Sequence, residues 1–75
     1  MWKVVGFKYR DAKNGSRYYD VYCQRECPKG VGLECTSFNF DSGYHGYVPV
    51  LNDIIVVSTY QYEGRTRVRE IAKIK

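Results

Sequence analysis

The sequence has no apolar run of the length that crosses a membrane, and its first residues contain no apolar core of a signal peptide. Its three cysteines, Cys23, Cys27 and Cys35, are an odd number and too few for the disulfide framework of a small secreted domain. From these absences we expect a protein with no membrane segment that works in a reducing, cytoplasmic setting.

The short motifs that mark common active sites are missing as well. There is no G-x-S-x-G elbow, no phosphate-binding P-loop and no G-x-G-x-x-G pattern. The only histidine, His45, lies in a glycine-rich segment, and the acidic residues are scattered without an obvious pair. Because nucleophilic catalysis needs a nucleophile, a base and a group that orients the base, we expect a protein that is not an enzyme and uses no cofactor.

The cysteines and His45 are the right donor set for a tetrahedral zinc ion, but their spacing is unfavourable. The pattern is Cys23-x3-Cys27-x7-Cys35, whereas zinc knuckles place two thiolates on one tight turn with C-x2-C. Cys23 also falls in an expected strand, on the same side as Tyr19 and Val21, where cysteine behaves as a small hydrophobic residue. We therefore expect Cys23 in the core and no metal site.

Length and composition limit the remaining classes. Seventy-five residues form one domain, residues 1–75, with a thin core. Twelve Lys and Arg against eight Asp and Glu give a net charge of +4, and eight residues are tyrosine. Cations and flat rings together favour a surface that binds a polyanion. The alternative is that the tyrosines are there as good strand residues.

Alternation of apolar and polar residues predicts five strands, and no segment holds a helical period long enough to indicate a clear helix. The segments are Trp2–Arg10, Arg17–Gln24, Leu33–Phe40, Ile54–Tyr60 and Arg65–Ile74. Asn14-Gly15 favours a type I′ hairpin turn, and Pro49 excludes the segment around it from a central strand. The pattern predicts an all-β, small five-stranded OB-fold-like barrel, with an SH3-like barrel as the alternative.

The alternation also predicts which side chains share a face. In the first strand it places Val5, Phe7 and Tyr9 on one face and Val4, Lys8 and Arg10 on the other, with Gly6 marking a bulge or a close backbone approach. In the second strand it places Tyr19, Val21 and Cys23 on one face and Tyr18, Asp20 and Tyr22 on the other. In the third strand it places Phe38 and Phe40 on the face opposite Leu33 and Cys35. Ile54–Tyr60, the most apolar segment, is predicted to be a core strand.

Basic and aromatic residues gather in three places: the first hairpin, the second loop and the last strand. Cations track phosphates and rings stack on bases in proteins that bind single strands, whereas duplex recognition favours a helix that this sequence lacks. Our candidate nucleic-acid-binding residues are Arg10, Lys13, Arg17, Tyr18, Tyr22, Tyr44, Tyr47, Arg65, Arg67 and Arg69. The alternative for the arginine row is a solvated strand face.

The order of these signals resembles a known family. The shared features are a short first strand (Val4-Val5-Gly6-Phe7), a basic hairpin followed by Gly15-Ser16-Arg17-Tyr18, and an acidic glycine segment (Asp41-Ser42-Gly43) leading to Tyr47-Val48-Pro49. A hairpin that begins at Ser58-Thr59-Tyr60 ends the chain with a return strand. The sequence resembles the single-stranded-DNA-binding, helix-destabilising proteins of filamentous phages and their small relatives on Gram-positive mobile elements.

The resemblance implies a dimeric OB-like barrel whose first hairpin is the DNA-binding wing, with Arg17 and Tyr18 on phosphate and base. It places the Tyr60–Val68 hairpin near the dimer axis. We therefore expect a homodimer that binds single-stranded DNA, with RNA left open, without sequence preference and in phage or plasmid replication. The alternative is a small β-barrel adaptor or inhibitor from a mobile element, in which the tyrosine-rich surface binds a protein.

Overall fold

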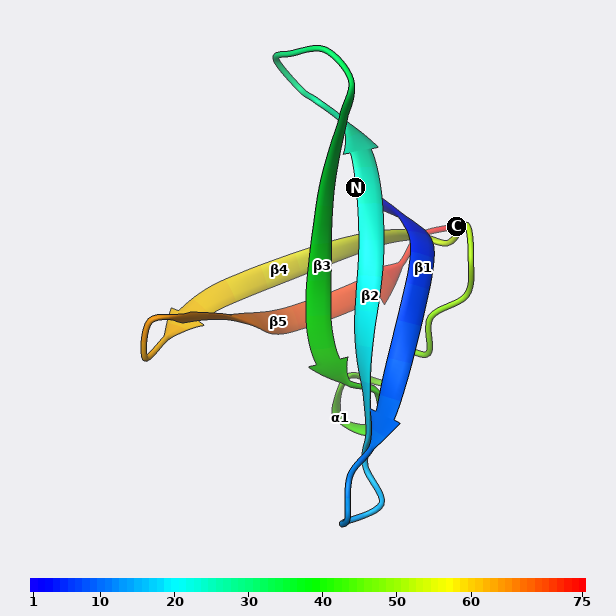
Figure 1. Cartoon of the computed structure of the whole chain (residues 1–75), viewed down its shortest axis with the longest axis vertical. Coiled ribbons are helices and arrows are strands. Elements are labelled where there is room, and N and C mark those ends of the chain that lie inside the picture. The colour runs from blue at the N-terminus through cyan, green and yellow to red at the C-terminus, as the bar shows by residue number, and fades with distance from the viewer.

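The computed structural model describes all 75 residues and contains five strands and one short helix (Figure 1). The strands are β1 (Trp2–Asp11), β2 (Arg17–Glu26), β3 (Leu33–Asp41), β4 (Ile54–Tyr62) and β5 (Arg65–Lys73), and the helix is α1 (Ser42–His45). The five predicted strands are confirmed, with ends that differ by at most two residues. The structure has no helix long and apolar enough to span a bilayer.

The strands form one antiparallel sheet in the order β3-β2-β1-β4-β5. β1, β2 and β3 follow one another through hairpins, and β4 returns through a long connection to lie beside β1, which is a Greek key. The β4–β5 hairpin then crosses behind β2 and β3 (Figure 1), and β5 approaches β3 without pairing with it. The all-β, OB-like class is thus confirmed. The sheet is half-open and does not form a closed barrel.

The bulge predicted at Gly6 is confirmed, and it corrects the faces of β1. The β1–β2 register pairs Val4 with Cys23 and Gly6 with Tyr22, so Val5 is the extra residue. Beyond the bulge Phe7 pairs with Val21. The extra residue changes the phase of the alternation, because a bulge sets two residues opposite one. Val4 therefore shares the core face with Phe7, whereas Val5 is exposed, and the predicted assignment of Val4 and Val5 is wrong.

The first hairpin turns where Asn14-Gly15 predicts it, but with a different geometry. Gly15 has a φ of 88°, whereas Asn14 is not among the residues with positive φ, so the turn is not type I′. The Gly15 N–H donates to the Ala12 carbonyl at 3.1 Å and the Ala12 N–H donates to the Ser16 carbonyl at 2.8 Å. This is a longer loop that ends in a left-handed glycine, the other common hairpin solution.

The core lies between the β1–β3 part of the sheet and the β4–β5 hairpin. It consists of Val4, Tyr19, Val21, Cys23, Phe40, Tyr47, Ile55 and Ile71. The shared faces predicted for β2 and β3 are confirmed, and the structure shows that they face the core, since Tyr19, Val21 and Cys23 are buried and Phe40 packs on Tyr19. Burial raises the pKa of the Cys23 thiol to about 11, so this thiol is neutral and unreactive at ordinary pH.

The prediction that Ile54–Tyr60 is a core strand holds at its beginning only. Ile55 is fully buried, an arrangement that contributes about 1.5–3 kcal/mol for a side chain of this size. Val56, on the other face of β4, is 44% exposed, and Tyr60 lies at the surface. β4 leaves the core because the hairpin projects beyond the strands that it crosses (Figure 1).

The segment between α1 and β4 closes one end of the core. Pro49 and Asp53 are buried, and the Tyr47 hydroxyl donates a hydrogen bond of 2.7 Å to the Asp53 carboxylate. The Nζ atom of Lys73 lies 3.5 Å from the other carboxylate oxygen. Burial, and then the neighbouring Asp53, raise the pKa of Tyr47 well above its ordinary value. The buried Asp53 carboxylate therefore links the segment between α1 and β4 to Lys73 of β5.

Candidate nucleic-acid interface

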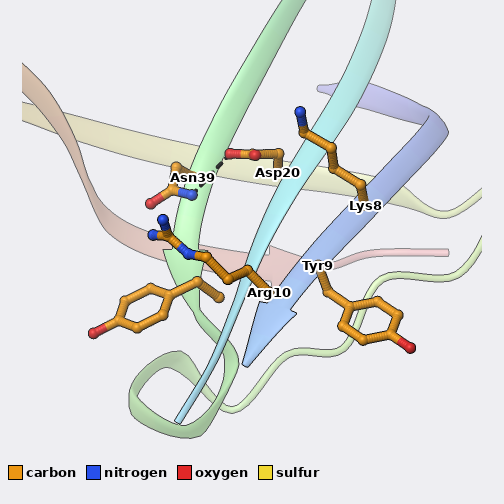
Figure 2. Close-up of a pocket in the computed structure, with 6 residues that line it drawn as sticks. Lys8, Tyr9, Arg10, Asp20 and Asn39 are labelled. Atoms are coloured by element: carbon orange, nitrogen blue, oxygen red, sulfur yellow. Dashed lines mark hydrogen bonds between the residues drawn. The ribbon is translucent and has the colours of Figure 1, made fainter. Parts of the chain in front are cut away.

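The outer face of β1–β3, which points away from the core, carries a basic hollow near the first hairpin. The register sets Lys8 opposite Asp20 and Arg10 opposite Tyr18. Figure 2 shows Lys8, Arg10, Asp20 and Asn39 projecting on one side of the sheet, whereas Tyr9 points away. The Asn39 amide donates a hydrogen bond of 2.8 Å to the Asp20 carboxylate, which fixes the floor of the hollow.

A second hollow adjoins the first at Tyr18 and Asn39. It lies where β3 and α1 face the projecting β4–β5 hairpin. Its lining includes Tyr18, Asn39, Tyr44, His45, Tyr60 and Arg67. The two hollows share residues, so they form one continuous surface. We call this surface the interface and define it by Lys8, Arg10, Tyr18, Asn39, Tyr44, Tyr60 and Arg67.

Helix α1 holds Tyr44 at the mouth of the second hollow. Asp41 caps the helix by accepting a 2.9 Å hydrogen bond from the Gly43 N–H, and Gly46, with a φ of 68°, ends it. The Ser42 hydroxyl donates to the Arg17 carbonyl at 3.2 Å and ties the helix to β2. Tyr44 packs edge-on against His45 and remains 83% exposed, so one ring face is open to a ligand.

Three exposed arginines lie over tyrosine rings and have no carboxylate partner. The guanidinium carbon to ring-centroid distances are 5.8 Å for Arg10 on Tyr18, 5.7 Å for Arg67 on Tyr62 and 5.5 Å for Arg69 on Tyr60. The three ion pairs of the structure involve other cations. These three guanidinium groups therefore keep their donors free for phosphate oxygens.

Two further arginines are also stacked, but each is held by a carboxylate. Arg25 lies 4.2 Å from the Trp2 ring and bonds Glu34 at 2.9 Å. Arg17 lies 4.2 Å from the Tyr9 ring and bonds Asp11 at 2.6 Å. This hydrogen bond lowers the pKa of Asp11 and raises that of Arg17 above its already high value. Both arginines are committed within the protein, so they are weaker candidates for a ligand.

The structure separates Arg17 from Tyr18, which the resemblance pairs as phosphate and base contacts. Adjacent residues of a strand point to opposite faces. Tyr18 lies on the outer face with Arg10, whereas Arg17 points with Tyr9 to the inner side. Only Tyr18 of this pair belongs to the interface.

The other candidates lie in different places. Lys13 is exposed in the first hairpin turn, and Arg65 begins β5 opposite Tyr62. Arg69 is the extra residue of a β5 bulge, because Ser58 pairs with Glu70 and the next pair is Thr59 with Val68. Tyr22 lies on the outer face towards the other end of β2, beside Val5 and Cys35.

One candidate is wrong. Tyr47 is 7% exposed and its hydroxyl is bonded to Asp53, so no base can stack on its ring. The residue follows a glycine in a loop-like segment, and nothing in that local pattern distinguishes it from the exposed Tyr44. Tyr47 is a core residue.

Three interface residues were missed among the candidates: Lys8, Asn39 and Tyr60. Tyr60 could have been found, because folding the last hairpin about Glu63-Gly64 sets Tyr60 opposite Arg67 and Tyr62 opposite Arg65. Lys8 could have been found from its spacing to Arg10. Asn39 had no signal, since its place depends on Asp20 of the neighbouring strand.

Charge at the interface is mixed, with cations in excess. Lys8, Arg10, Arg67 and the neighbouring Arg69 face two carboxylates, Asp20 and Asp41. Both carboxylates accept hydrogen bonds within the protein, from Asn39 and Gly43 respectively. The remaining potential is positive and attracts an anion.

The structure brings no metal-ligand cluster together. Cys23 is buried, Cys27 half-buried and Cys35 exposed, and all three are free thiols. No group of three or more His, Cys, Asp or Glu side chains is close enough to hold an ion.

Comparison of the chain with protein-family models, with curated protein sequences and with solved structures finds no match.

Proposed function

We propose that this protein binds single-stranded nucleic acid, with DNA as the expected ligand, through the interface and without sequence preference. The observation that carries the proposal is the set of three arginines that lie over tyrosine rings without a carboxylate partner. Such contacts occur about once per 70–80 residues in proteins, so three of this kind in a chain of 75 residues is a concentration. They supply phosphate donors and base-stacking rings side by side.

In the proposed mechanism, both members of an arginine–tyrosine pair contact the ligand: the arginine binds a phosphate and the tyrosine ring stacks on a base. A phosphate draws the guanidinium of Arg10 from the ring of Tyr18, because a charge-assisted hydrogen bond is stronger than an exposed cation–π contact. The ring face that is uncovered then accepts a base, a contact that contributes about 1–3 kcal/mol per base whatever its identity. Tyr44, which is already open, requires no such exchange.

A single strand fits this surface better than a duplex. The one helix has four residues, too short to read a major groove. The tyrosines present ring faces, and base faces are accessible only when bases are unstacked. The expected setting is phage or plasmid replication, in line with the family that the sequence resembles.

A homodimer completes the proposal. The segment that connects α1 to β4 exposes Val48, Val50 and Leu51, each by more than half. Exposed apolar groups at this density favour association of a small domain with a thin core. Sedimentation velocity at several concentrations tests this part, and a single monomer species throughout would contradict it.

The experiment that tests the function is fluorescence anisotropy with a labelled oligo-dT of about 20 nucleotides and a matched duplex. With three or four phosphates neutralised, log K is expected to fall with log salt at a slope of roughly −2 to −3. Binding to the duplex should be much weaker. Absence of binding at about 50 mM salt would refute the proposal and favour the adaptor alternative.

A further inference from the structure

β1 has a free backbone edge along its C-terminal half. β4 pairs with β1 at Trp2 and Lys3 only, and the Asn52 N–H and Asp53 carbonyl bond Val4. No strand pairs with this side of β1 beyond Val4, and Figure 1 shows no strand beyond this half of β1 on the side away from β2.

The hairpin shows which peptide groups point to this edge. The Ala12 N–H donates across the hairpin to the Ser16 carbonyl, and peptide orientation alternates along an antiparallel strand. Arg10 and Lys8 therefore direct their backbone groups to β2. Phe7, Tyr9 and Asp11 direct theirs to the free edge. Three consecutive positions of a ladder are thus without a backbone partner.

The side chains along this edge alternate in chemistry. Lys8 and Arg10 are exposed on the outer face. On the other face Phe7 is 38% exposed and Tyr9 is 56% exposed. The one carboxylate of the stretch, Asp11, is already neutralised by Arg17 at 2.6 Å. The edge is therefore basic on one face and aromatic on the other.

A second copy of β1 does not fit this edge. Opposite residues of an antiparallel ladder point to the same face. In the register that pairs the whole stretch with itself, Lys8 lies opposite Arg10 and Phe7 opposite Asp11. Like charges placed directly opposite each other are destabilising.

We propose that the β1 edge from Phe7 to Asp11 binds an extended acidic peptide segment of a protein partner, in which acidic residues alternate with apolar ones. The peptide adds a strand: its backbone bonds the free groups of Phe7, Tyr9 and Asp11, its carboxylates face Lys8 and Arg10, and its apolar residues cover Phe7 and Tyr9. The site goes beyond nucleic-acid binding and does not depend on it, although Lys8 and Arg10 belong to both surfaces.

The test uses a fluorescein-labelled peptide of about eight residues that alternates Glu and Val, a scrambled peptide of the same composition, and the alternating peptide with N-methyl groups on the edge-facing nitrogens. The alternating peptide is expected to bind at least about tenfold more tightly than either control, a difference of about 1.4 kcal/mol. Equal binding of the alternating and scrambled peptides would overturn the proposal, since charge alone would then explain it.

Hydrogen exchange locates the site. In the free protein the amides of Phe7 and Tyr9 should exchange faster than those of Lys8 and Arg10, and the peptide should protect Phe7 and Tyr9. A bound peptide that leaves both amides unprotected would also overturn the proposal. Lys8→Gln should weaken peptide binding several-fold, whereas Lys29→Gln, the same charge change in the exposed 27–32 loop, should not. Because no nucleic acid is present, the result is independent of the proposed function.

Discussion

At the scale of the residue, the partner of an arginine decides what the arginine can do. Arg10 and Arg17 lie at the same hairpin and each covers a tyrosine ring, but only Arg17 is also held by a carboxylate, Asp11. A guanidinium bonded to an internal carboxylate must first give up that bond to meet a phosphate. Arg10 has no such bond to lose.

This difference predicts a contrast between two variants of equal charge. Arg10→Gln should weaken binding to oligo-dT by about 5- to 20-fold and reduce the steepness of the salt slope by about 0.7, the share of one phosphate on a single strand. Arg17→Gln should change binding less than about threefold. Anisotropy titrations at several salt concentrations measure both. Equal losses for the two variants would contradict the assignment of faces.

The buried pair of Tyr47 and Asp53 makes a second residue prediction. Tyr47→Phe removes the hydroxyl that donates to Asp53 and leaves a buried carboxylate with Lys73 alone. The free energy of unfolding should fall by about 1–3 kcal/mol. DNA affinity of the folded variant should be unchanged. Urea denaturation followed by anisotropy separates the two effects, and a loss of affinity at full stability would show that Tyr47 reaches the ligand.

At the scale of the element, the sequence predicted where the strands lie. It predicted less well which side chains face the core and which strands come into contact. Alternation over β2 placed Tyr19, Val21 and Cys23 on one face, which the structure buries, because period two continues unbroken there. In β1 the same reasoning failed at Val4, since a single extra residue at Val5 inverts the faces. The sequence could not predict that Tyr18 and Arg67 line the same hollow, because strands far apart in the chain come together only through the return of β4.

The first hairpin provides a test at this scale. Gly15 has a φ of 88°, which a side chain rarely adopts, whereas Gly30 lies outside the positive-φ region. Gly15→Ala should therefore lower the free energy of unfolding by about 1 kcal/mol. Gly30→Ala should be close to neutral, because its new Cβ meets only the Cβ of Cys27 at 3.5 Å, an ordinary contact. Thermal unfolding of both variants measures this difference, and equal costs would argue against a left-handed Gly15 in the turn.

At the scale of the whole molecule, the buried groups of the thin core make the free energy of unfolding change with pH in the alkaline range. Burial raises the pKa of Cys23 from its ordinary value of 9.0 to about 11. The unfolded chain loses this proton near pH 9, whereas the folded chain keeps it. The contribution of the neutral Cys23 thiol to the free energy of unfolding is therefore complete below pH 9 and declines as the pH rises towards 11. Tyr47, whose pKa is raised from 10.0, adds to the loss at higher pH.

Urea denaturation between about pH 7.5 and pH 10.5 measures this dependence. The free energy of unfolding should be flat up to about pH 9 and fall above it. Cys23→Ala should be less stable at neutral pH, by about 1 kcal/mol for the cavity that it leaves, and should have a shallower decline between pH 9 and pH 10. An unaltered decline in this variant would assign the effect to other groups.

The stacking of Arg25 on Trp2 has a spectroscopic consequence. Trp2 is the only tryptophan, it packs edge-on against Phe38, and it lies outside the interface, on the side of the core. Its emission should therefore change when the chain unfolds and stay constant when a nucleic acid occupies the tyrosines. The tyrosine emission should respond to the ligand. One unlabelled sample thus carries two separate optical signals, one for folding and one for occupancy, and a single titration can read both.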